Sequence, residues 1–378
     1  MKELGIYVHI PFCSSKCYYC DFVSFPNQYN KIDKYINYLI VEIEKYKEIL
    51  KEYTVKTIFI GGGTPSYLEG QHIGRVLEHI YKTFNSDEIE EITIETNPGT
   101  LNEEKLKLYK EYGIDRISIG VQSLNDNLLK SIGRGHTSMD FYRSFELMRN
   151  LNFKNVNVDL IYGLPNQTLK DCERTLEEIV NLDVEHISYY SLILEDNTLM
   201  NKWYKEGRIK LPDEEIEREM YHYGISFLKS KGYNHYEISN FSKEGIECKH
   251  NLFYWQLKPY IGFGIAAHSN INNKRFWNYN NFKDYFISLE KNKYPIDGEE
   301  HIDKEMEIAE YFIMGLRLIE GINKNVFKER FKIKVEDIYE DVLVKYKNRG
   351  LLHIDDEWIR FTPKGLDLSN IVYVDLLP

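Results

Sequence analysis

The sequence is poor in the features that mark secreted, membrane-spanning and nucleic-acid-binding proteins. It has only five cysteines in 378 residues, no run of 18 apolar residues, and 48 basic against 59 acidic residues, for a net charge of −11. Few cysteines in an odd number argue against a disulfide-built fold, and the missing apolar run argues against a transmembrane helix. The acidic excess argues against a general nucleic-acid binder, which would carry a basic patch. Because the start, Met1-Lys2-Glu3, also lacks an apolar signal segment, we expect a cytoplasmic protein.

Short β-rich runs alternate with amphipathic patterns from residue 5 to about residue 195. The runs predict strands at 5–10, 55–60, 91–96, 116–121, 156–161 and 186–193. The periodicity between them predicts helices at 32–53, 103–112, 138–151 and 169–182. Strands that alternate with helices form right-handed βαβ units around a parallel sheet. Six such units predict an α/β fold built as a partial (β/α)6, TIM-like barrel.

The alternation degrades past residue 200. A helix is expected at 214–231, irregular or strand structure at 233–241, and a linker near 294–298, where the composition changes. Helical patterns at 304–318, 324–331 and 335–347 then precede a predicted hairpin of 351–354 and 358–361. We therefore expect a barrel core at 1–240, a connecting region at 241–298, and a small, mainly helical, winged-helix-like C-terminal domain at 299–378.

Polar and turn residues gather where the predicted strands end. Cysteines follow the first strand, and the triplet Gly61-Gly62-Gly63 follows the second. Glu95 closes the third strand, Gln122 follows the fourth, and Asp159 lies within the fifth. The carboxyl ends of parallel barrel strands share one face, which carries the site in barrel proteins. We expect these residues to meet there.

Three of the cysteines, Cys13, Cys17 and Cys20, lie within eight residues in a C-x3-C-x2-C spacing. Three thiolates can hold an iron–sulfur cluster and leave one iron open for a small ligand, whereas four would favour plain electron transfer. Aromatic residues beside the cysteines can shield such a cluster. A zinc ion with His9 as its fourth ligand, or a disulfide with one free thiol, are the alternatives.

The other strand-end residues also have simpler interpretations. The glycine triplet can be a tight turn, or it can clear space for backbone contacts to a ligand. Glu95 can be a solvated edge charge, or an acceptor for a ribose diol or an amine. Asp159 lies in an apolar run, where an uncompensated carboxylate is costly, so we expect it to have a partner.

The cysteine spacing and the Gly-Gly-Gly-Thr-Pro motif together resemble the radical S-adenosylmethionine superfamily over roughly residues 5–270. The resemblance implies a 4Fe-4S cluster on Cys13, Cys17 and Cys20, with the amine and carboxylate of S-adenosylmethionine on the open iron. It also implies reductive cleavage of the sulfonium to methionine and a 5′-deoxyadenosyl radical. That chemistry belongs to the cofactors, and the protein orients them and excludes water.

Within the superfamily, Tyr7-Val8-His9-Ile10-Pro11-Phe12-Cys13 is similar to one branch. That branch contains oxygen-independent coproporphyrinogen III dehydrogenase and the HemW-type haem chaperones. The resemblance implies a S-adenosylmethionine pocket lined by Tyr7, Tyr19, Gly62, Gly63, Thr64, Glu95, Gln122, Arg134 and Asp159. Arg134 lies in Gly133-Arg134-Gly135-His136, a loop that suits close approach to a carboxylate. Without the resemblance, it would equally be a surface arginine.

Two features separate the members of this branch. The dehydrogenases carry a further cysteine two residues after the third, where this sequence has Phe22, as the chaperones do. The segment His250-Asn251-Leu252-Phe253-Tyr254-Trp255 is similar to the chaperones' H-N-x-x-Y-W motif, which implies haem binding by His250, Asn251, Tyr254 and Trp255. A histidine can ligate haem iron, and aromatic rings offer flat faces for a porphyrin. From these six residues alone, a helix start with aromatic packing is the simpler interpretation.

The resemblance therefore favours a haem chaperone that hands haem to an acceptor protein, such as a respiratory enzyme. Coproporphyrinogen III dehydrogenase is the alternative, and a radical enzyme with another substrate is a third. The sequence leaves open peripheral contact with a membrane, the oligomeric state, and the roles of Cys172 and Cys248.

One segment departs from the chaperone pattern. The sequence has Gly264-Ile265-Ala266-Ala267-His268-Ser269, where these proteins usually have a Gly-Pro-Gly-Ala-His-Ser-like run. The change alters the backbone freedom of this loop. It leaves His268 as a second candidate contact to haem or cofactor.

Overall fold

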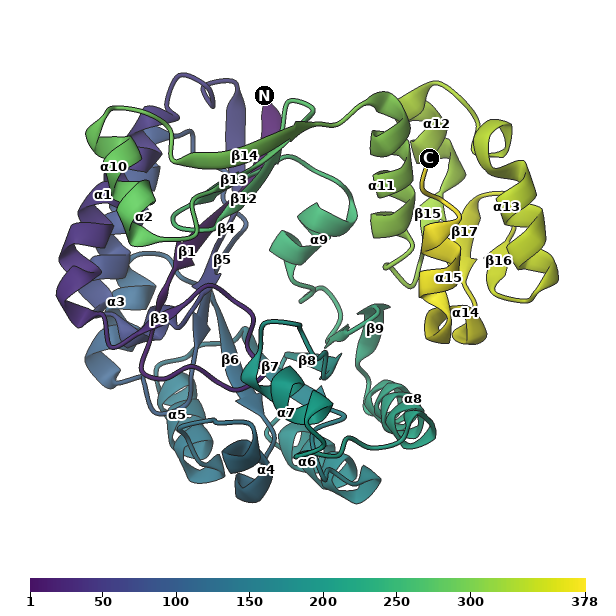
Figure 1. The fold of residues 1–378 in the computed structure, drawn as a ribbon, viewed down its shortest axis with the longest axis horizontal. Coiled ribbons are helices and arrows are strands. Elements are labelled where there is room, and N and C mark those ends of the chain that lie inside the picture. The colour runs from purple at the N-terminus through teal and green to yellow at the C-terminus, as the bar shows by residue number, and fades with distance from the viewer.

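A computed structural model describes all residues, 1–378, and its centre is a 12-stranded sheet (Figure 1). Six neighbouring strands run parallel, in the order of the sequence: β1 (Lys2–Ile10), β4 (Tyr53–Gly62), β5 (Glu91–Thr96), β6 (Arg116–Gln122), β7 (Val156–Tyr162) and β8 (His186–Ser191). Helices cross back between them: α1 (Ile32–Lys45), α2 (Gly70–Thr83), α3 (Glu103–Glu111), α4 (Asp126–Ser131), α5 (Ser138–Asn150) and α6 (Leu169–Asn181). The predicted α/β, partial (β/α)6 barrel is confirmed.

Side chains along each strand alternate between the helices and the barrel interior. On β6, Ile117 and Ile119 belong to the large hydrophobic core, whereas Arg116 and Ser118 line an interior cavity. The strands therefore carry two patterns at once, an apolar outer face and a polar inner face. The polar inner face is the surface from which a site can be built.

The barrel is not closed by its own strands. β1 pairs on its far side with β11 (Tyr260–Phe263), and β8 pairs with β10 (Asn240–Ser242), which pairs with β9 (Asn234–Glu237). The short helix α9 (Lys249–Trp255) contacts β4 and lies between these two halves of the sheet (Figure 1). Helices α7 (Leu199–Lys205) and α8 (Glu214–Ser230) follow β8.

Two sequence expectations about element ends are wrong. The helix expected at 32–53 ends at Lys45, because β4 begins at Tyr53 and the intervening turns bury Leu50 without helix. The linker expected at 294–298 lies mostly in the edge strand β14 (Ile296–His301). That strand pairs with β13 (Lys274–Asn278), beyond β12 (His268–Ile271), and helix α10 (Phe282–Glu290) precedes it. These strands extend the main sheet, so residues 241–298 contribute an edge of it as well as helices α9 and α10.

The C-terminal residues form a second hydrophobic core, which includes Phe312, Phe327 and Ile359. Its elements are α11 (Lys304–Gly315), β15 (Ile322–Asn323), α12 (Lys324–Phe331), α13 (Glu336–Asn348), β16 (Leu352–Ile354), β17 (Trp358–Phe361), α14 (Pro363–Asp367) and α15 (Ser369–Val374). The three strands form a small sheet in the order β15-β17-β16, so the expected helices and hairpin are present in a winged-helix-like arrangement. We propose that the two units divide after β14. No helix of the chain has the length and apolarity needed to cross a membrane.

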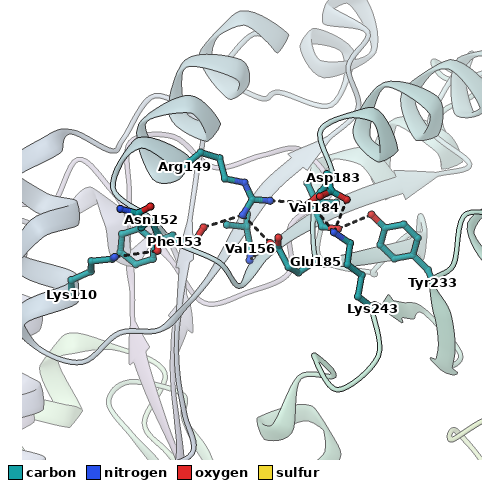
Figure 2. A network of polar contacts seen from close by, with 10 residues as sticks. All are labelled: Lys110, Arg149, Asn152, Phe153, Val156, Asp183, Val184, Glu185, Tyr233 and Lys243. Carbon is teal, nitrogen blue, oxygen red and sulfur yellow. Dashed lines mark hydrogen bonds and ion pairs between the residues drawn. The ribbon is translucent and has the colours of Figure 1, made fainter.

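A polar network joins the amino ends of β7 and β8 (Figure 2). Arg149 of α5 pairs with Glu185 at 3.0 Å and donates to the carbonyl of Asp183 at 3.1 Å. Glu185 also accepts from the backbone N–H of Val156 at 3.1 Å, and Lys243 pairs with Asp183 at 2.7 Å. This end of a barrel is usually structural rather than functional. The network accordingly lies away from the cavity described below.

One buried carboxylate connects the first helix to the loop after β11. Glu42 of α1 is fully buried and accepts from the backbone N–H of Gly264 at 2.8 Å, from Asn278 Nδ2 at 2.6 Å and from the Tyr285 hydroxyl at 2.6 Å. Burial raises the pKa of Glu42 to about 7, although these three donors oppose the rise. Glu42 therefore holds a proton in the folded chain under conditions in which an exposed glutamate has lost it.

This raised pKa makes folding stability depend on pH. Between pH about 4.5 and about 7, the unfolded chain releases a proton that the folded chain keeps, so the free energy of unfolding falls as pH rises, by up to about 3 kcal/mol for this group. Glu42→Gln removes that component, and we expect a shallower fall in urea titrations of the apo-protein across this range. Glu48→Gln, at a side chain that is 81% exposed, is the matched control and should leave the slope unchanged. A slope equal to wild type in Glu42→Gln would contradict the raised pKa.

The loop held by Glu42 contains a strained residue. Ala266 has a φ of 56°, in the left-handed region that disfavours residues with a Cβ, and it stands where the chaperone pattern has glycine. Its backbone N–H donates to the carbonyl of Tyr279 at 3.0 Å, which keeps the strained conformation in place.

Ala266→Gly should relieve this strain. We expect the free energy of unfolding to rise by about 1 kcal/mol, measured by urea denaturation. Ala309→Gly, within α11, is the opposite control and should lower it by about 1 kcal/mol, since glycine weakens a helix interior. Destabilisation by both substitutions would argue against strain at Ala266.

Candidate functional site

The loop that carries the three cysteines is anchored at its ends and in its middle. β2 (Phe12–Cys13) pairs in parallel with β3 (Phe25–Pro26), which joins the two ends. In the middle, the Tyr18 N–H donates to the Ile132 carbonyl at 3.0 Å, and the Tyr18 carbonyl accepts from the Met200 N–H at 2.9 Å. Cys13, Cys17 and Cys20 all line one cavity of about 610 Å³ at the carboxyl ends of the barrel strands.

The end of β4 passes directly against this loop. Gly62 has a φ of 108°, and a Cβ there would lie 2.5 Å from the His9 ring; a Cβ on Gly63 would lie 2.7 Å from the Phe12 carbonyl oxygen. Glycine is therefore required for packing, and the backbone it exposes lines the cavity. Thr64 follows, with its hydroxyl 3.4 Å from the Cys13 sulfur.

Arg134 connects the cysteine loop to two strand ends. Its guanidinium donates to Asn97 Oδ1 at 2.7 Å and to the Gly120 carbonyl, and it reaches the Cys17 sulfur at 3.6 Å. It is an interior residue of the cavity wall and not a surface arginine. Its role in the structure is to position Cys17 against β5 and β6.

Gln122 is aimed into the cavity by a backbone irregularity. The pairing of β6 with β7 shifts register between Gly120 and Gln122, and Gln122 has a φ of 68°. Such a bulge re-aims a side chain and stores strain next to a site. The Gln122 Oε1 atom is buried without a hydrogen-bond partner, so the cavity offers an acceptor to a ligand.

Two partly buried carboxylates face the same space. Glu95 accepts from the Gly62 N–H at 3.0 Å, and burial, with a contribution from Asp159, raises its pKa to about 8. Asp159 accepts from Asn157 Nδ2 at 2.7 Å and from the Ser118 hydroxyl at 3.1 Å, which confirms that it has partners. Burial raises the pKa of Asp159, although those donors oppose the rise. Glu95 is thus a partly buried acceptor on the cavity wall and not a solvated edge charge.

The sulfur arrangement fits a multi-iron cluster better than a single ion. No three His, Cys, Asp or Glu side chains of the chain are grouped closely enough to share one metal ion. His9 donates through Nε2 to the Val23 carbonyl at 2.8 Å and accepts at Nδ1 from the Tyr7 hydroxyl at 3.0 Å, so neither ring nitrogen is free for zinc. Three cysteine thiols that line one cavity supply the donor set of an iron–sulfur cluster with one open iron.

Helix α9, which carries the H-N-x-x-Y-W segment, seals the open side of the barrel. Glu91 at the start of β5 accepts from the N–H of Lys249 at 2.8 Å and from the N–H of His250 at 3.2 Å. The His250 ring is 1% exposed and hydrogen bonds to Thr57 Oγ1 at 2.8 Å and to the Tyr254 hydroxyl at 2.9 Å. Burial lowers the pKa of His250 to about 3, so the ring is neutral. Both its nitrogens are occupied in this conformation.

The other residues of this segment face different neighbours. Asn251 lines the cavity, and Trp255 stacks under the Arg317 guanidinium at 4.4 Å, beside the C-terminal unit. Of the residues assigned to the cofactor pocket, Tyr7 lies behind the wall, with its ring stacked on Phe59. The expected residues that meet on the cavity are Cys13, Cys17, Tyr19, Cys20, Gly62, Gly63, Thr64, Glu95, Gln122, Arg134, Asp159 and Asn251; those outside it are Tyr7, His250, Tyr254 and Trp255.

The residues with open roles lie elsewhere. Cys172 and Cys248 are buried, and burial raises the pKa of each thiol to about 12. The Cys248 thiol lies 3.4 Å from Glu91 and belongs to the start of α9. His268 is exposed on β12 and stacks on Trp277, outside the cavity.

Sequence reasoning missed the inner wall of the cavity. Arg116, Asn157 and Ser188 line it, but Arg116 begins β6 and the other two stand inside β7 and β8, away from the carboxyl ends of the strands. The signal was present as polar residues at alternate positions of β6, β7 and β8, where a strand buried on both faces would be apolar throughout. That alternation marks the interior of the barrel as polar.

Comparisons with known proteins agree with this geometry. A family model described as Radical SAM superfamily matches residues 7–179, and one described as HemN C-terminal domain matches residues 302–368, beginning directly after β14. The structure of coproporphyrinogen III oxidase (HemN) from Escherichia coli superposes with a TM-score of 0.87 at 23% identity, covering 99% of this chain and 90% of that one. At that identity the likeness shows a shared fold.

The relatives found by sequence similarity identify a narrower family than the shared fold does. The protein named Heme chaperone HemW of Bacillus subtilis is 39% identical over 370 residues, covering 97% of each chain. Its namesake in Lactococcus lactis is 39% identical over 376 residues, covering 100% of this chain and 98% of that one. The Escherichia coli protein of the same name is 32% identical over 353 residues, covering 91% and 89%. The chain therefore belongs to the radical SAM superfamily and, within it, to the family of proteins named Heme chaperone HemW.

Proposed function

We propose that this protein is a cytoplasmic haem chaperone that binds a 4Fe-4S cluster, S-adenosylmethionine and haem, and passes haem to an acceptor protein such as a respiratory enzyme. The observation that carries the proposal is the position of α9. The helix with the haem-type segment packs against the same barrel whose cavity is lined by the three cysteines, and Asn251 of that helix lines the same cavity. The full-length similarity to proteins named as haem chaperones supports the same function.

The cavity residues divide into two groups by chemistry. The thiolates of Cys13, Cys17 and Cys20 would hold the cluster, which when bound supplies the electron for cleavage of S-adenosylmethionine. Glu95 and the unpartnered Gln122 Oε1 would accept hydrogen bonds from the amine and hydroxyl groups of S-adenosylmethionine. The exposed glycine backbone of β4 supplies further contacts.

Haem ligation by His250 requires a local rearrangement. The imidazole is neutral, as an iron ligand must be, but its two nitrogens are bonded to Thr57 and Tyr254. Loss of the Tyr254 hydrogen bond would free Nε2 for iron and leave Nδ1 on Thr57, which fixes the ring orientation. Tyr254 is therefore the competitor that haem iron must displace.

The residue after the cysteine loop separates this proposal from porphyrin decarboxylation. Phe22 is 58% exposed at the rim of the cavity, at the position where the dehydrogenases have a fourth cysteine. An apolar side chain there adds no sulfur ligand and offers a flat surface to a porphyrin.

The ligand role of His250 is tested by substitution. His250→Ala should lower haem affinity at least about ten-fold in absorbance titrations of the anaerobically reconstituted protein, because the axial bond is lost. Iron and sulfide content should equal wild type, since no cysteine is changed. Unaltered haem affinity would remove His250 as the ligand.

Two further variants separate ligation from packing. Tyr254→Phe removes the hydroxyl that competes for Nε2, so haem affinity should be equal to or higher than that of wild type. His235→Ala deletes another buried histidine, which stacks on Phe241 on the β9–β10 strands, and it should leave haem affinity unchanged. Equal losses in His250→Ala and His235→Ala would indicate general destabilisation.

The chaperone proposal and the enzymatic alternative predict different numbers of turnovers, and the result expected for a chaperone is as follows. Reconstituted protein, given coproporphyrinogen III, S-adenosylmethionine and a reductant under anaerobic conditions, should form less than one protoporphyrinogen per protein. The products are followed by fluorescence after oxidation. Multiple turnovers would replace the chaperone proposal with the dehydrogenase.

A further inference from the structure

Arg116, the first residue of β6, is a buried cation that the proposed function does not use. It is 2% exposed, and it lines the inner end of the cavity. None of its side-chain nitrogens forms a hydrogen bond or an ion pair with another residue, and Nε is fully buried without a partner. An arginine carries five N–H donors that cannot be neutralised by deprotonation, so this arrangement is costly unless a ligand completes it.

The neighbouring carboxylates are committed elsewhere. Glu91 accepts from the start of α9, and Asp159 accepts from Asn157 and Ser118. Neither forms an ion pair with Arg116. Burial opposes the charge of the guanidinium, but the charges of Glu91 and Asp159 favour it, and the pKa of Arg116 is raised. The guanidinium is therefore charged and lacks a contact partner within the protein.

The other cations on this cavity are already engaged. Lys16 donates to the Phe22 carbonyl at 3.2 Å, at the exposed rim. Arg134 is held by Asn97 and Gly120. Arg116 is the cation on the cavity wall that is left for an anionic ligand.

The position of Arg116 indicates which anion. A guanidinium fork matches a carboxylate, which it can bind through two parallel hydrogen bonds. Arg116 shares the cavity wall with Asn251 of α9 and with Phe59, on which the His250 ring stacks at 5.3 Å. A porphyrin at α9 brings two propionate carboxylates to this part of the barrel.

We propose that Arg116 binds a propionate carboxylate of the bound haem and so anchors the porphyrin at the inner end of the cavity. The inference rests on the proposed haem-binding function and adds the residue that binds a propionate side chain of the haem. The same carboxylate chemistry occurs in the methionyl group of S-adenosylmethionine, so the experiment must separate the two sources.

The experiment compares haem with haem dimethyl ester, which lacks both carboxylates. Wild type, Arg116→Met and Arg116→Lys are reconstituted anaerobically and titrated with each porphyrin, and S-adenosylmethionine affinity is measured by equilibrium dialysis. Arg149→Met, in the network of Figure 2 outside the cavity, is the control for loss of a partly buried, ion-paired arginine. Thermal unfolding identifies variants that fail to fold, and Arg116→Lys, which keeps the charge, serves if Arg116→Met is unstable.

Arg116→Met should bind haem about ten-fold more weakly than wild type and haem dimethyl ester equally well, because only the free acid uses the guanidinium. Arg116→Lys should still bind haem more tightly than haem dimethyl ester, but by a smaller factor than wild type. Equal loss for both porphyrins, unchanged haem affinity, or a loss confined to S-adenosylmethionine would each overturn the proposal. If wild type binds haem and haem dimethyl ester with equal affinity, the proposed role of Arg116 is wrong and the chaperone proposal is unaffected. If wild type binds neither porphyrin, the chaperone proposal itself is wrong.

Discussion

Glu91 accepts hydrogen bonds from the backbone N–H groups at the start of α9 and thereby fixes the one helix that spans the gap in the barrel. Six parallel strands do not close a barrel, and α9 lies in the opening between β1 and β8 (Figure 1). Glu91 holds the start of α9 in that opening through the N–H groups of Lys249 and His250. One buried carboxylate thereby links the barrel, the cavity and the segment that resembles a haem motif.

The two ends of the barrel are built for different tasks. At the amino ends of β7 and β8, Arg149, Glu185 and Lys243 are all engaged with one another or with backbone, which stabilises the scaffold (Figure 2). At the carboxyl ends, Gln122 and Arg134 keep buried polar atoms without partners. Unsatisfied groups of this kind cost stability and persist where a ligand completes them. Together with Nε of Arg116 at the start of β6, these atoms line the cavity and mark it as a binding site without reference to any relative.

Strand positions and strand-end residues were predictable because they are local. The strand expected at 91–96 is present with those bounds, and the cysteine loop, the glycine triplet, Glu95 and Asp159 line one cavity as expected. The helix expected at 32–53 failed, because helical periodicity continues into turns that bury Leu50. The expected linker at 294–298 failed for a related reason: a Pro and Gly-containing stretch of mixed composition can also be an edge strand. Arg116 and Asn157 were missed, since a polar residue inside a strand gains meaning only when the strand's inner face is known.

Local patterns were enough to predict the cysteine loop, the parallel α/β order and the family, because cysteine spacing and the alternation of elements are properties of neighbouring residues. The state of the haem-type segment, in contrast, depends on contacts between distant parts of the chain. His250 is held by Thr57, which lies 193 positions away, and its helix is held by Glu91, 159 positions away. No local pattern around residue 250 specifies those partners. The closing of an incomplete barrel by α9 brings them together, and it also determines that the histidine is neutral, buried and bonded at both nitrogens.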